Sequence, residues 1–258
     1  MKKIVLASAA LVASAMAPAM AADLAAAPFY TKAPAIPAFY NWAGFYAGLN
    51  AGGASSHNCW TLTGIAGVPP APALSEGCRN ATGGLAGGQL GYRWQASNWI
   101  FGVEAQGDWA NLTGSSPSLL VLPGSTATNQ SKTDALGLFT GQAGYAWNSV
   151  LWYVKGGAAV THDKYRGIAT ATGFAFDQAS ETRWGGALGT GLEWQFAPGW
   201  SVGVEYDHLF MGNHGVTFTS LTPPLGIATR SEGIKQDVDM GLVRLNYTFS
   251  AAPFVSRY

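Results

Sequence analysis

The sequence predicts an all-β fold, an eight-stranded antiparallel up-and-down barrel that crosses a membrane. Three observations predict it: segments in which apolar and polar residues alternate, connections that are short and long in strict turn, and tryptophans gathered beside the short connections. Alternation is expected because successive side chains of a strand point to opposite faces, and in a membrane barrel one face meets lipid and the other meets the lumen.

The segment around Glu104 shows the alternation most clearly. One face of residues 98–110 carries no charge and consists of Trp99, Phe101, Val103, Ala105, Gly107 and Trp109. The opposite face holds Glu104 and Asp108. A tilted strand needs about 9–11 residues to cross a membrane, so this segment is long enough to cross once.

Seven further segments repeat this division between a nearly charge-free face and a polar or small face. A single alternating segment is weak evidence, because half-buried strands of soluble proteins alternate as well. Eight of them together favour a lipid-facing barrel. The predicted strands are Ala43–Ala54, Gly84–Trp94, Asn98–Ala110, Ala135–Trp147, Leu151–Thr161, Arg183–Phe196, Trp200–Phe210 and Asp239–Phe249.

The lengths of the connections give an independent signal. Three of them are short and centre on Ala96-Ser97, Asn148-Ser149 and Ala197-Pro198-Gly199. The other four are long, and we expect them to form external loops: Ser55–Ala81, Asn111–Asp134, His162–Thr182 and Met211–Lys235. Strict alternation of short periplasmic turns with long external loops is typical of outer-membrane barrels.

Tryptophan lies on both sides of every short connection. The six residues are Trp94, Trp99, Trp147, Trp152, Trp194 and Trp200. Amphipathic rings prefer the headgroup level of a bilayer, so the sequence predicts an aromatic girdle at one end of the barrel. The alternative is that these rings only cap the hairpins of a soluble barrel.

The first 21 residues read as a signal peptide. Met1-Lys2-Lys3 is a basic start, Ile4–Ala17 is apolar, and Ala19-Met20-Ala21 is a small-residue cleavage site, which predicts a mature chain beginning at Ala22. The apolar run is shorter than the roughly 20 residues of a membrane helix. Residues 22–42, rich in Ala and Pro, are expected to form a periplasmic arm, and residues 43–258 the outer-membrane barrel.

The two cysteines are expected to form a disulfide. An export signal places Cys59 and Cys78 in an oxidising compartment, where an even pair of cysteines is usually bridged. Two free thiols are the alternative. Two cysteines without histidine at ligand spacing do not predict a zinc site, so we expect no metal and no cofactor.

The polar faces of the strands define a candidate lumen network. Its predicted members are Arg93, Glu104, Asp108, Lys155, Arg183, Glu193, Glu205, Asp207 and Arg244. An eight-stranded barrel is only wide enough for side chains to fill it, and buried charges need partners. The sequence therefore favours a paired polar plug, with a narrow ion-conducting pore as the alternative and a wide solute channel excluded by geometry.

Catalysis is not predicted. The chain has no G-x-S-x-G elbow and no H-E-x-x-H motif, and no nucleophile can be paired with a base. Four histidines fall in or near the predicted external loops: His57, His162, His208 and His214. They are either solvated or ligands to haem or a metal, since neutral imidazole is a common metal ligand.

The charge balance excludes nucleic acid as a partner. The chain has 14 Lys and Arg against 14 Asp and Glu, so it carries no strong field of either sign. No stretch after the signal peptide is apolar for long enough to form a membrane helix. A soluble periplasmic ligand-binding barrel remains the alternative to a membrane barrel, and it would need the apolar faces to point inward around a cavity.

Several segments resemble a known family of exported proteins. They are Ala21–Leu24, Trp42–Gly48, Glu205–Tyr206, Val243–Phe249 and Arg257–Tyr258. In these segments the chain resembles the small alphaproteobacterial outer-membrane immunogenic or porin-family proteins, which are relatives of the OmpA transmembrane domain. The resemblance extends over nearly the whole mature chain.

This resemblance implies an outer-membrane location, surface-exposed loops that act as antigens, and no second, peptidoglycan-binding domain. It also implies insertion by the barrel-assembly machinery, with Phe249 or Tyr258 as the C-terminal aromatic signal. The expected partners are outer-membrane lipids and lipopolysaccharide, and a homo-oligomer is left open. The expected function is a structural barrel that supports envelope integrity. The alternatives are a loop-based surface binder or adhesin, with haem as one ligand, and a narrow ion-conducting pore.

Overall fold

A computed structural model describes residues 40–65, 67–69, 72–118 and 126–249 of the chain. The predicted signal peptide, most of the predicted arm and the terminal Tyr258 lie outside the described residues. The described part of the chain contains no helix long and apolar enough to cross a membrane.

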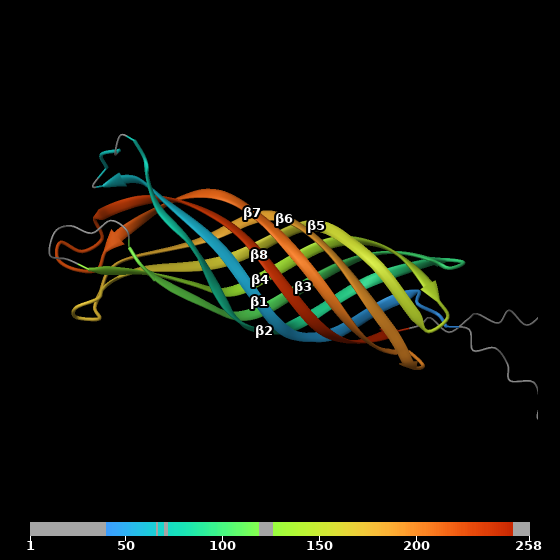
Figure 1. Ribbon diagram of the computed structural model, residues 1–258. Coiled ribbons are helices and arrows are strands. Elements are labelled where there is room, and N and C mark those ends of the chain that lie inside the picture. The colour runs from blue at the N-terminus through green and yellow to red at the C-terminus, as the bar shows by residue number, and fades with distance from the viewer. Residues whose placement is uncertain (1–39, 66, 70–71, 119–125, 250–258) are drawn as a thin grey trace, which may run out of the picture. The chain divides into compact units, whose positions relative to one another are not determined.

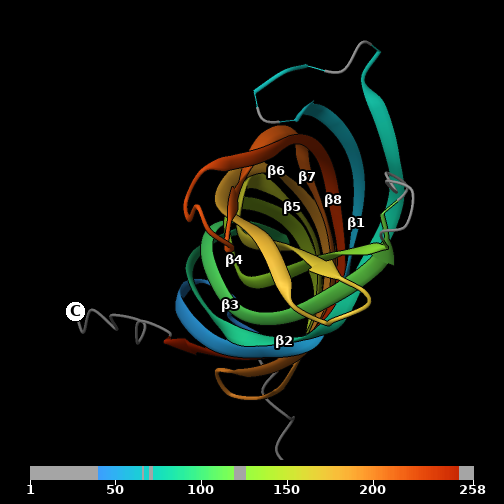
Figure 2. The same ribbon diagram turned by 90° about the vertical axis from the view of Figure 1, so that its left-hand side faces the viewer.

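Eight antiparallel strands form a closed barrel in which each strand pairs with its neighbours in sequence and β1 pairs with β8 (Figures 1 and 2). This confirms the predicted fold class. The strands are β1 (Gly44–Ile65), β2 (Leu74–Ala96), β3 (Trp99–Pro117), β4 (Ala127–Trp147), β5 (Val150–Ala169), β6 (Ala175–Ala197), β7 (Trp200–Ser220) and β8 (Ala228–Phe249).

The two ends of the barrel differ in their connections (Figure 1). At one end, here called the short-turn end, residues 97–98, 148–149 and 198–199 make tight turns. Pro198-Gly199 suits a type II turn, in which proline presets the first φ and glycine takes the positive φ, here 77°. The other end, the long-connection end, carries the connections of residues 66–73, 118–126, 170–174 and 221–227.

The strands are longer than predicted, and the predicted external loops are correspondingly shorter. Each strand has 19 to 23 residues, so the paired ladder continues through most of the segments that the sequence analysis assigned to loops. For example, Ser55–Ala81 was expected to be a loop, whereas β1 runs to Ile65 and β2 begins at Leu74. The loop prediction was wrong in extent, although the position of each connection was right.

The reason is that the alternation changes its character partway along each strand. Near the short-turn end the outward side chains are apolar, and the exposed ones include Phe45, Leu49, Leu90, Phe139, Leu188 and Val243. Towards the long-connection end the outward side chains become polar, such as Lys132, His162, Lys164, Gln178, Ser180 and Lys235. Inward positions there include large apolar residues such as Trp60, Phe218 and Ile234. The apolar outward side chains form a band around the barrel, here called the apolar belt. A search for strands by their apolar outer face therefore stops at the edge of this belt, although the strands continue.

Candidate functional site

The interior of the barrel is the candidate site, because most of the charged side chains of the chain lie in it. All nine residues of the predicted lumen network are buried, each with at most 5% of its surface exposed. Seven of them lie near the short-turn end and are here called the inner network: Arg93, Glu104, Lys155, Glu193, Glu205, Asp207 and Arg244. Their ion pairs form two sets, Arg93 with Glu193 and the other five together, and Tyr46 lies between the sets, 4.3 Å from the Arg93 guanidinium and hydrogen-bonded to Glu104.

Arg93 and Glu193 cross the lumen from β2 to β6. The two guanidinium nitrogens of Arg93 donate to the two carboxylate oxygens of Glu193 at 3.1 and 2.7 Å, which is the bidentate arrangement that Arg favours. Ser201 Oγ and Asn246 Nδ2 donate to the same carboxylate at 2.5 and 3.0 Å. Both oxygens of the Glu193 carboxylate therefore accept hydrogen bonds from protein groups.

Arg244 and Lys155 link the remaining carboxylates. Arg244 donates to Glu104 through Nη2 and to Glu205 through Nη1. Lys155 Nζ lies 2.7 Å from Glu205, 3.3 Å from Asp207 and 3.5 Å from Glu104. The five groups come from β3, β5, β7 and β8, so the network ties opposite walls of the barrel together.

Two tyrosines extend this network, and the sequence analysis did not single them out. Tyr46 Oη donates to Glu104 at 2.6 Å, and Tyr153 Oη donates to Glu205 at 2.5 Å. Each phenol lies over a glycine of a neighbouring strand. A Cβ at Gly91 would be 2.6 Å from the Tyr46 ring, and one at Gly191 would be 2.5 Å from the Tyr153 ring. Glycine at these two positions makes room for the rings.

Asp108 and Arg183 are less closely tied to the inner network. Asp108 accepts from Gln106 Nε2 at 2.9 Å, and Gln106 in turn accepts from Lys155 at 3.3 Å, so Asp108 joins the network through an amide. Arg183 lies in a different layer, where it donates to Glu181, to Tyr165 Oη at 3.0 Å and to the carbonyl of Ile234 at 3.1 Å. Arg183 therefore points into the lumen but lies outside the inner network.

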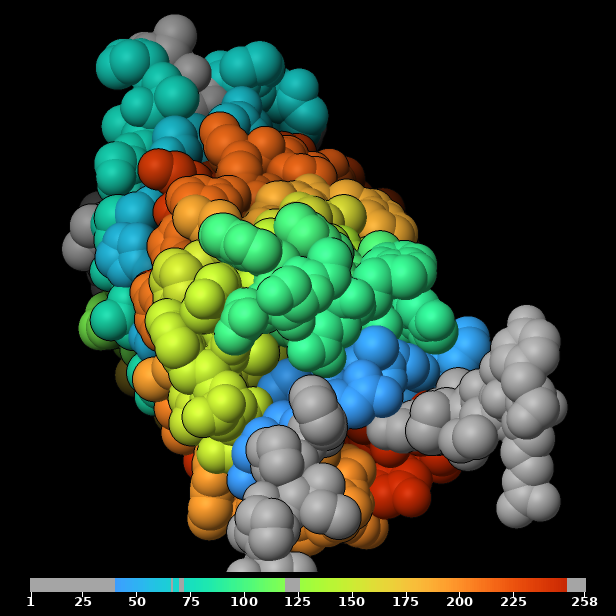
Figure 3. Space-filling model, turned by 90° about the vertical axis from the view of Figure 1, so that its right-hand side faces the viewer, coloured from blue at the N-terminus to red at the C-terminus, as the bar shows by residue number. Residues whose placement is uncertain are grey.

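Trp42 covers the inner network at the short-turn end. Its side chain is 1% exposed and packs with Ile100, Ala146, Leu151 and Tyr153. Its indole N–H donates to the carbonyl of Asn148 at 3.2 Å, and its backbone N–H donates to Gln95 at 2.9 Å. In the space-filling view of this end, the start of β1 meets the β2–β3 and β4–β5 turns (Figure 3). The side chain of Trp42 therefore lies inside the barrel mouth.

A layer of apolar side chains lies on the other side of the inner network. Every one of the eight strands contributes to it, and none of its members is polar. We call this the apolar layer; its members are Ala54, Ala81, Leu85, Leu112, Leu136, Leu138, Ala159, Ala187, Leu209, Met211, Val238, Met240 and Leu242. Leu138, Leu209 and Val238 have no exposed surface at all. The apolar layer separates the inner network from Arg183 and from the groups beyond it.

A second group of charges, which the sequence analysis assigned to loops, lies near the long-connection end. Arg230 pairs with Asp177 at 2.9 Å and with Glu232 at 3.0 Å, and lies 3.8 Å from Glu76. Burial, reinforced by the negative charge of Glu76, raises the pKa of Glu232 from its usual value near 4.5 to about 7. Burial lowers the pKa of Arg79. The continuing alternation of residue types was the signal that could have revealed this group.

Aromatic rings support these outer charges. Trp60, Tyr165, Val216, Phe218 and Ile234 form a buried cluster between the apolar layer and the outer charges. The guanidinium of Arg79 lies 4.3 Å from the Trp60 ring centre, and that of Arg230 lies 4.2 Å from the Phe218 ring centre. A cation over an aromatic face is attracted by the ring quadrupole.

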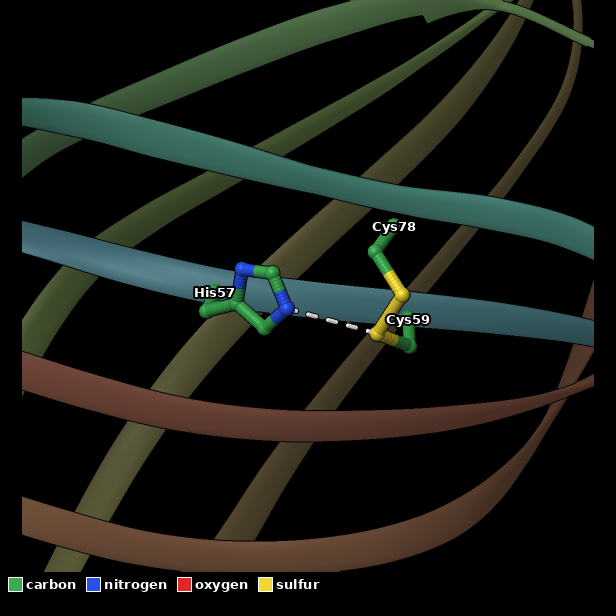
Figure 4. A group of neighbouring side chains, drawn as sticks. All are labelled: His57, Cys59 and Cys78. Atoms are coloured by element: carbon green, nitrogen blue, oxygen red, sulfur yellow. Dashed lines mark hydrogen bonds between the residues drawn. A yellow bond between two sulfur atoms is a disulfide. The ribbon is translucent and has the colours of Figure 1, made fainter.

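Cys59 and Cys78 form a disulfide between directly paired positions of β1 and β2 (Figure 4). His57 Nε2 lies 3.5 Å from Cys59 Sγ, so these three residues are close enough together to resemble a metal site. This proximity was not predicted from the sequence. With both sulfurs in the disulfide, neither is available as a thiolate, which is the form that binds metals.

The four histidines lie on strands and have separate partners. His57 contacts Asn80 at 2.7 Å, and His162 contacts Thr182 at 3.1 Å. His208 contacts Asp239 at 2.7 Å, and His214 lies 3.8 Å from Glu181. The four side chains come from β1, β5 and β7, and their contacts do not bring them together on a common ligand.

The six tryptophans beside the short turns all point outward. Their exposed fractions lie between 42% and 55% for Trp94, Trp99, Trp147, Trp152, Trp194 and Trp200. Of the other tryptophans, Trp109 and Trp184 point outward at the other edge of the apolar belt, whereas Trp42 and Trp60 are buried inside the barrel.

A family model described as "Outer membrane protein beta-barrel domain" matches residues 7–223 of the chain. Among its relatives, the "31 kDa outer-membrane immunogenic protein" of Brucella melitensis is 28% identical over 226 residues, which cover 84% of this chain and 90% of the relative. The protein of the same description from Brucella suis matches equally well.

Two solved structures that match the chain share little sequence with it and have TM-scores below 0.5. The outer membrane protease OmpT from Escherichia coli is 8% identical, with a TM-score of 0.49 over 80% of this chain and 97% of its own. The outer membrane protein OprG from Pseudomonas aeruginosa is 15% identical, with a TM-score of 0.48 over 81% of this chain and 97% of its own.

Proposed function

The chain belongs to the outer membrane protein beta-barrel domain family and lies in the outer membrane, and on this premise we propose that it is a structural barrel with a sealed lumen. Its role would be to support envelope integrity and to present its long-connection end at the cell surface. Neither catalysis nor solute passage is part of this proposal.

The observation that carries the proposal is the apolar layer between two polar regions of the lumen. Moving an ion from water into an apolar environment costs several kcal/mol even after the protein relaxes. Buried side chains from all eight strands fill this layer, and Leu138, Leu209 and Val238 have no exposed surface. The inner network and Trp42 add a second barrier nearer the short-turn end.

The orientation follows from the connections and the aromatic side chains. Outer-membrane barrels place short turns in the periplasm and longer connections outside. We therefore assign the short-turn end to the periplasm and the six outward tryptophans to the inner headgroup level. Trp109 and Trp184, 80% and 59% exposed, would mark the outer headgroup level.

An ion-conducting pore is the less favoured reading of the same interior. It needs a continuous polar path, whereas Leu138, Leu209 and Met240 interrupt the polar side chains. The inner network cannot open such a path by itself, because the apolar layer lies beyond it.

A surface binder or adhesin is a second candidate, and one observation favours it. Large apolar side chains are exposed at the tips of the long-connection end, among them Val68, Phe174, Leu225 and Ile227. Exposed apolar side chains beside polar ones are typical of binding surfaces. Absorbance titration of the folded protein with haem tests the haem version of this idea, with the four histidines changed together to Ala as the comparison.

The proposed function is tested in cells that lack the chain. We expect such cells to admit more of a hydrophobic dye and to become more sensitive to detergent, and we expect the wild-type gene to restore both. A variant with less apolar surface at these tips, Phe174→Ser with Leu225→Ser, should restore dye exclusion and detergent resistance as well. Slower uptake of a small hydrophilic solute in cells without the chain would overturn the proposal and favour a pore.

A further inference from the structure

Exposed positive charge is gathered on one side of the barrel. Among the described residues, four cationic side chains are exposed: Lys132, Lys164, Arg166 and Lys235. Three of these lie on the neighbouring strands β4 and β5, whereas Lys235 lies on β8 beside Asp237, at 3.9 Å. The side formed by β4 and β5 is therefore basic, and the side formed by β8 is not.

The three cations lie next to one another in the sheet. Lys132 pairs directly with Lys164, and Arg166 follows Lys164 on the same face of β5. Like charges directly opposite each other destabilise a sheet. Asp134 contacts Lys164 at 2.6 Å, but within the described part of the chain no carboxylate lies within ion-pair distance of Lys132 or Arg166. The group has an excess of positive charge that a bound anion would neutralise.

The surface is hollowed at this group. A hollow of about 160 Å³ is lined by Lys132, Lys164, Arg166 and Gln130. A neighbouring hollow of about 310 Å³ shares Lys164 and Arg166. Its other lining residues include polar side chains with hydrogen-bonding groups, namely Gln178, Ser180 and Thr219. Ammonium, guanidinium, amide and hydroxyl groups therefore line two adjoining hollows that share Lys164 and Arg166.

The basic group lies beyond the apolar belt, between the belt and the long-connection end. On β5 the outward residue Val160 precedes Lys164 by four positions, which is about 13 Å along a strand. On β4 and β6, Phe139 and Trp184 stack with ring centres 6.3 Å apart at the edge of the belt. A lipid whose chains lie against Val160 and these rings would carry its headgroup to the level of the cations.

We propose that this face of β4, β5 and β6 binds the phosphate group of a lipid in the outer leaflet of the membrane. The bisphosphorylated glycolipid of that leaflet has the required chemistry, because it joins phosphates to acyl chains. Arg166 would hold a phosphate through two N–H donors, and Lys132 and Lys164 would act as point charges. This inference rests on the proposed orientation, which places the long-connection end at the cell surface.

A lipid is favoured over a soluble anion because apolar side chains lie below the basic group on the same face, with Val160 four positions before Lys164 on β5. Free phosphate could use the same donors, but it would gain nothing from the apolar surface below them. A soluble sulfated polysaccharide would likewise use the charges alone. A lipid should therefore bind more tightly than a soluble anion, because only the lipid has acyl chains that contact the apolar surface.

The test measures retention of lipid by the full-length protein, folded in phosphatidylcholine nanodiscs and then titrated with bisphosphorylated lipid A. Native mass spectrometry counts the bound molecules. Replacing all three cations, as Lys132→Gln, Lys164→Gln and Arg166→Gln, should weaken binding by on the order of 100-fold, because each cation near an anionic headgroup contributes about fivefold. Lys235→Gln is the matched control and should bind like the wild type.

Further ligands separate the sources of the phosphate. Dephosphorylated lipid A should bind as weakly to the wild type as lipid A binds to the triple variant. Equal retention of lipid A by the wild type and the triple variant would overturn the proposal. So would binding of inorganic phosphate or heparin that is as tight as that of lipid A, because the acyl chains would then contribute nothing.

A gel shift on boiling shows that each variant is a folded barrel, so a loss of binding is not a loss of fold. Conductance of the same wild-type sample is measured separately. An open lumen with an intact lipid site would contradict the proposed function and leave this inference standing. A sealed lumen without lipid retention would leave the proposed function standing and overturn this inference.

Discussion

Arg244 joins two carboxylates that reach the lumen from different strands, Glu104 on β3 and Glu205 on β7. The three side chains are buried to at least 95%. Attraction within a buried ion pair repays the loss of hydration only while both partners are present. Replacing a single residue of the inner network therefore leaves a buried charge without its partner and destabilises the folded barrel.

Replacing Arg244 with Met should lower the free energy of unfolding by about 3–5 kcal/mol, because two buried carboxylates lose their shared cation. Urea unfolding in lipid vesicles, followed by tryptophan fluorescence, measures the change. The exposed Lys235→Met serves as the control and should cost less than about 1 kcal/mol. A loss that small for Arg244→Met would show that the network contributes little to stability.

The raised pKa of Glu232 predicts how the stability of the long-connection end changes with pH. Its pKa is raised to about 7 in the folded protein, so the folded state holds its proton more tightly than the unfolded state. The stability from this group is fully present below about pH 4.5 and is lost as pH rises through about 7. The loss is on the order of 3 kcal/mol.

Amide hydrogen exchange of the first residues of β8 tests this prediction. After correction for the intrinsic rates, protection should fall between pH 5 and pH 8 in the wild type. Glu232→Gln should remove most of that fall, because the variant has no proton to lose. An identical fall in the variant would assign the pH dependence to other groups.

Whether a side chain points into the barrel or outward could be predicted from whether its position in the strand is odd or even, here called its parity. Tyr46 and Asn50 point inward on β1, and the same parity places Trp42 and Trp60 inside as well. The sequence analysis did not extend the parity to these two residues, because it ended the strand at residues 43 and 54. The partners of each charge could not be predicted, since they depend on which walls face each other.

At the level of the strands, the lipid-facing half was predictable and the outer half was not. Between Trp99 and Trp109 the outward face is apolar and easily recognised. Beyond the belt the outward side chains meet water and are polar, and the inward side chains are both polar and apolar. The sequence of this part of each strand therefore resembles that of a loop. Backbone pairing nevertheless continues there, for example from Lys164 opposite Ser180 to Gly167 opposite Asp177. Hydrogen bonds between strands extend the barrel without help from lipid.

The disulfide fixes the extended part of β1 to β2. It closes a segment of 19 residues in sequence, and a loop of that size corresponds to about 3 kcal/mol of stabilisation in the chain-entropy account. Changing Cys59 and Cys78 together to Ser should therefore let this hairpin open more often.

Limited proteolysis measures the opening. Cleavage within residues 66–73 should become faster in the double variant, while the gel shift of the closed barrel on boiling stays the same. Treating the wild type with a thiol reductant should give the same change. Equal cleavage rates in all samples would mean that strand pairing alone holds the hairpin.

Over the whole barrel, the interior is arranged in alternating polar and apolar layers. From the short-turn end these are the cluster around Trp42, the inner network, the apolar layer, the layer of Arg183, the cluster around Trp60 and the outer charges. An eight-stranded barrel is narrow enough for side chains to fill each layer completely. The sequence predicted a polar plug but not the layers, because layering depends on the stagger between strands.

Conductance in a planar lipid bilayer shows whether the lumen is sealed, because a sealed barrel and a pore give opposite results there. The protein is inserted as a folded barrel, and the gel shift on boiling of the same sample shows that the barrel is closed. We predict no current steps at either polarity, because the apolar layer blocks ions. Steady, ohmic steps that scale with the number of inserted barrels would contradict the account and show that a polar path passes Leu138 and Leu209.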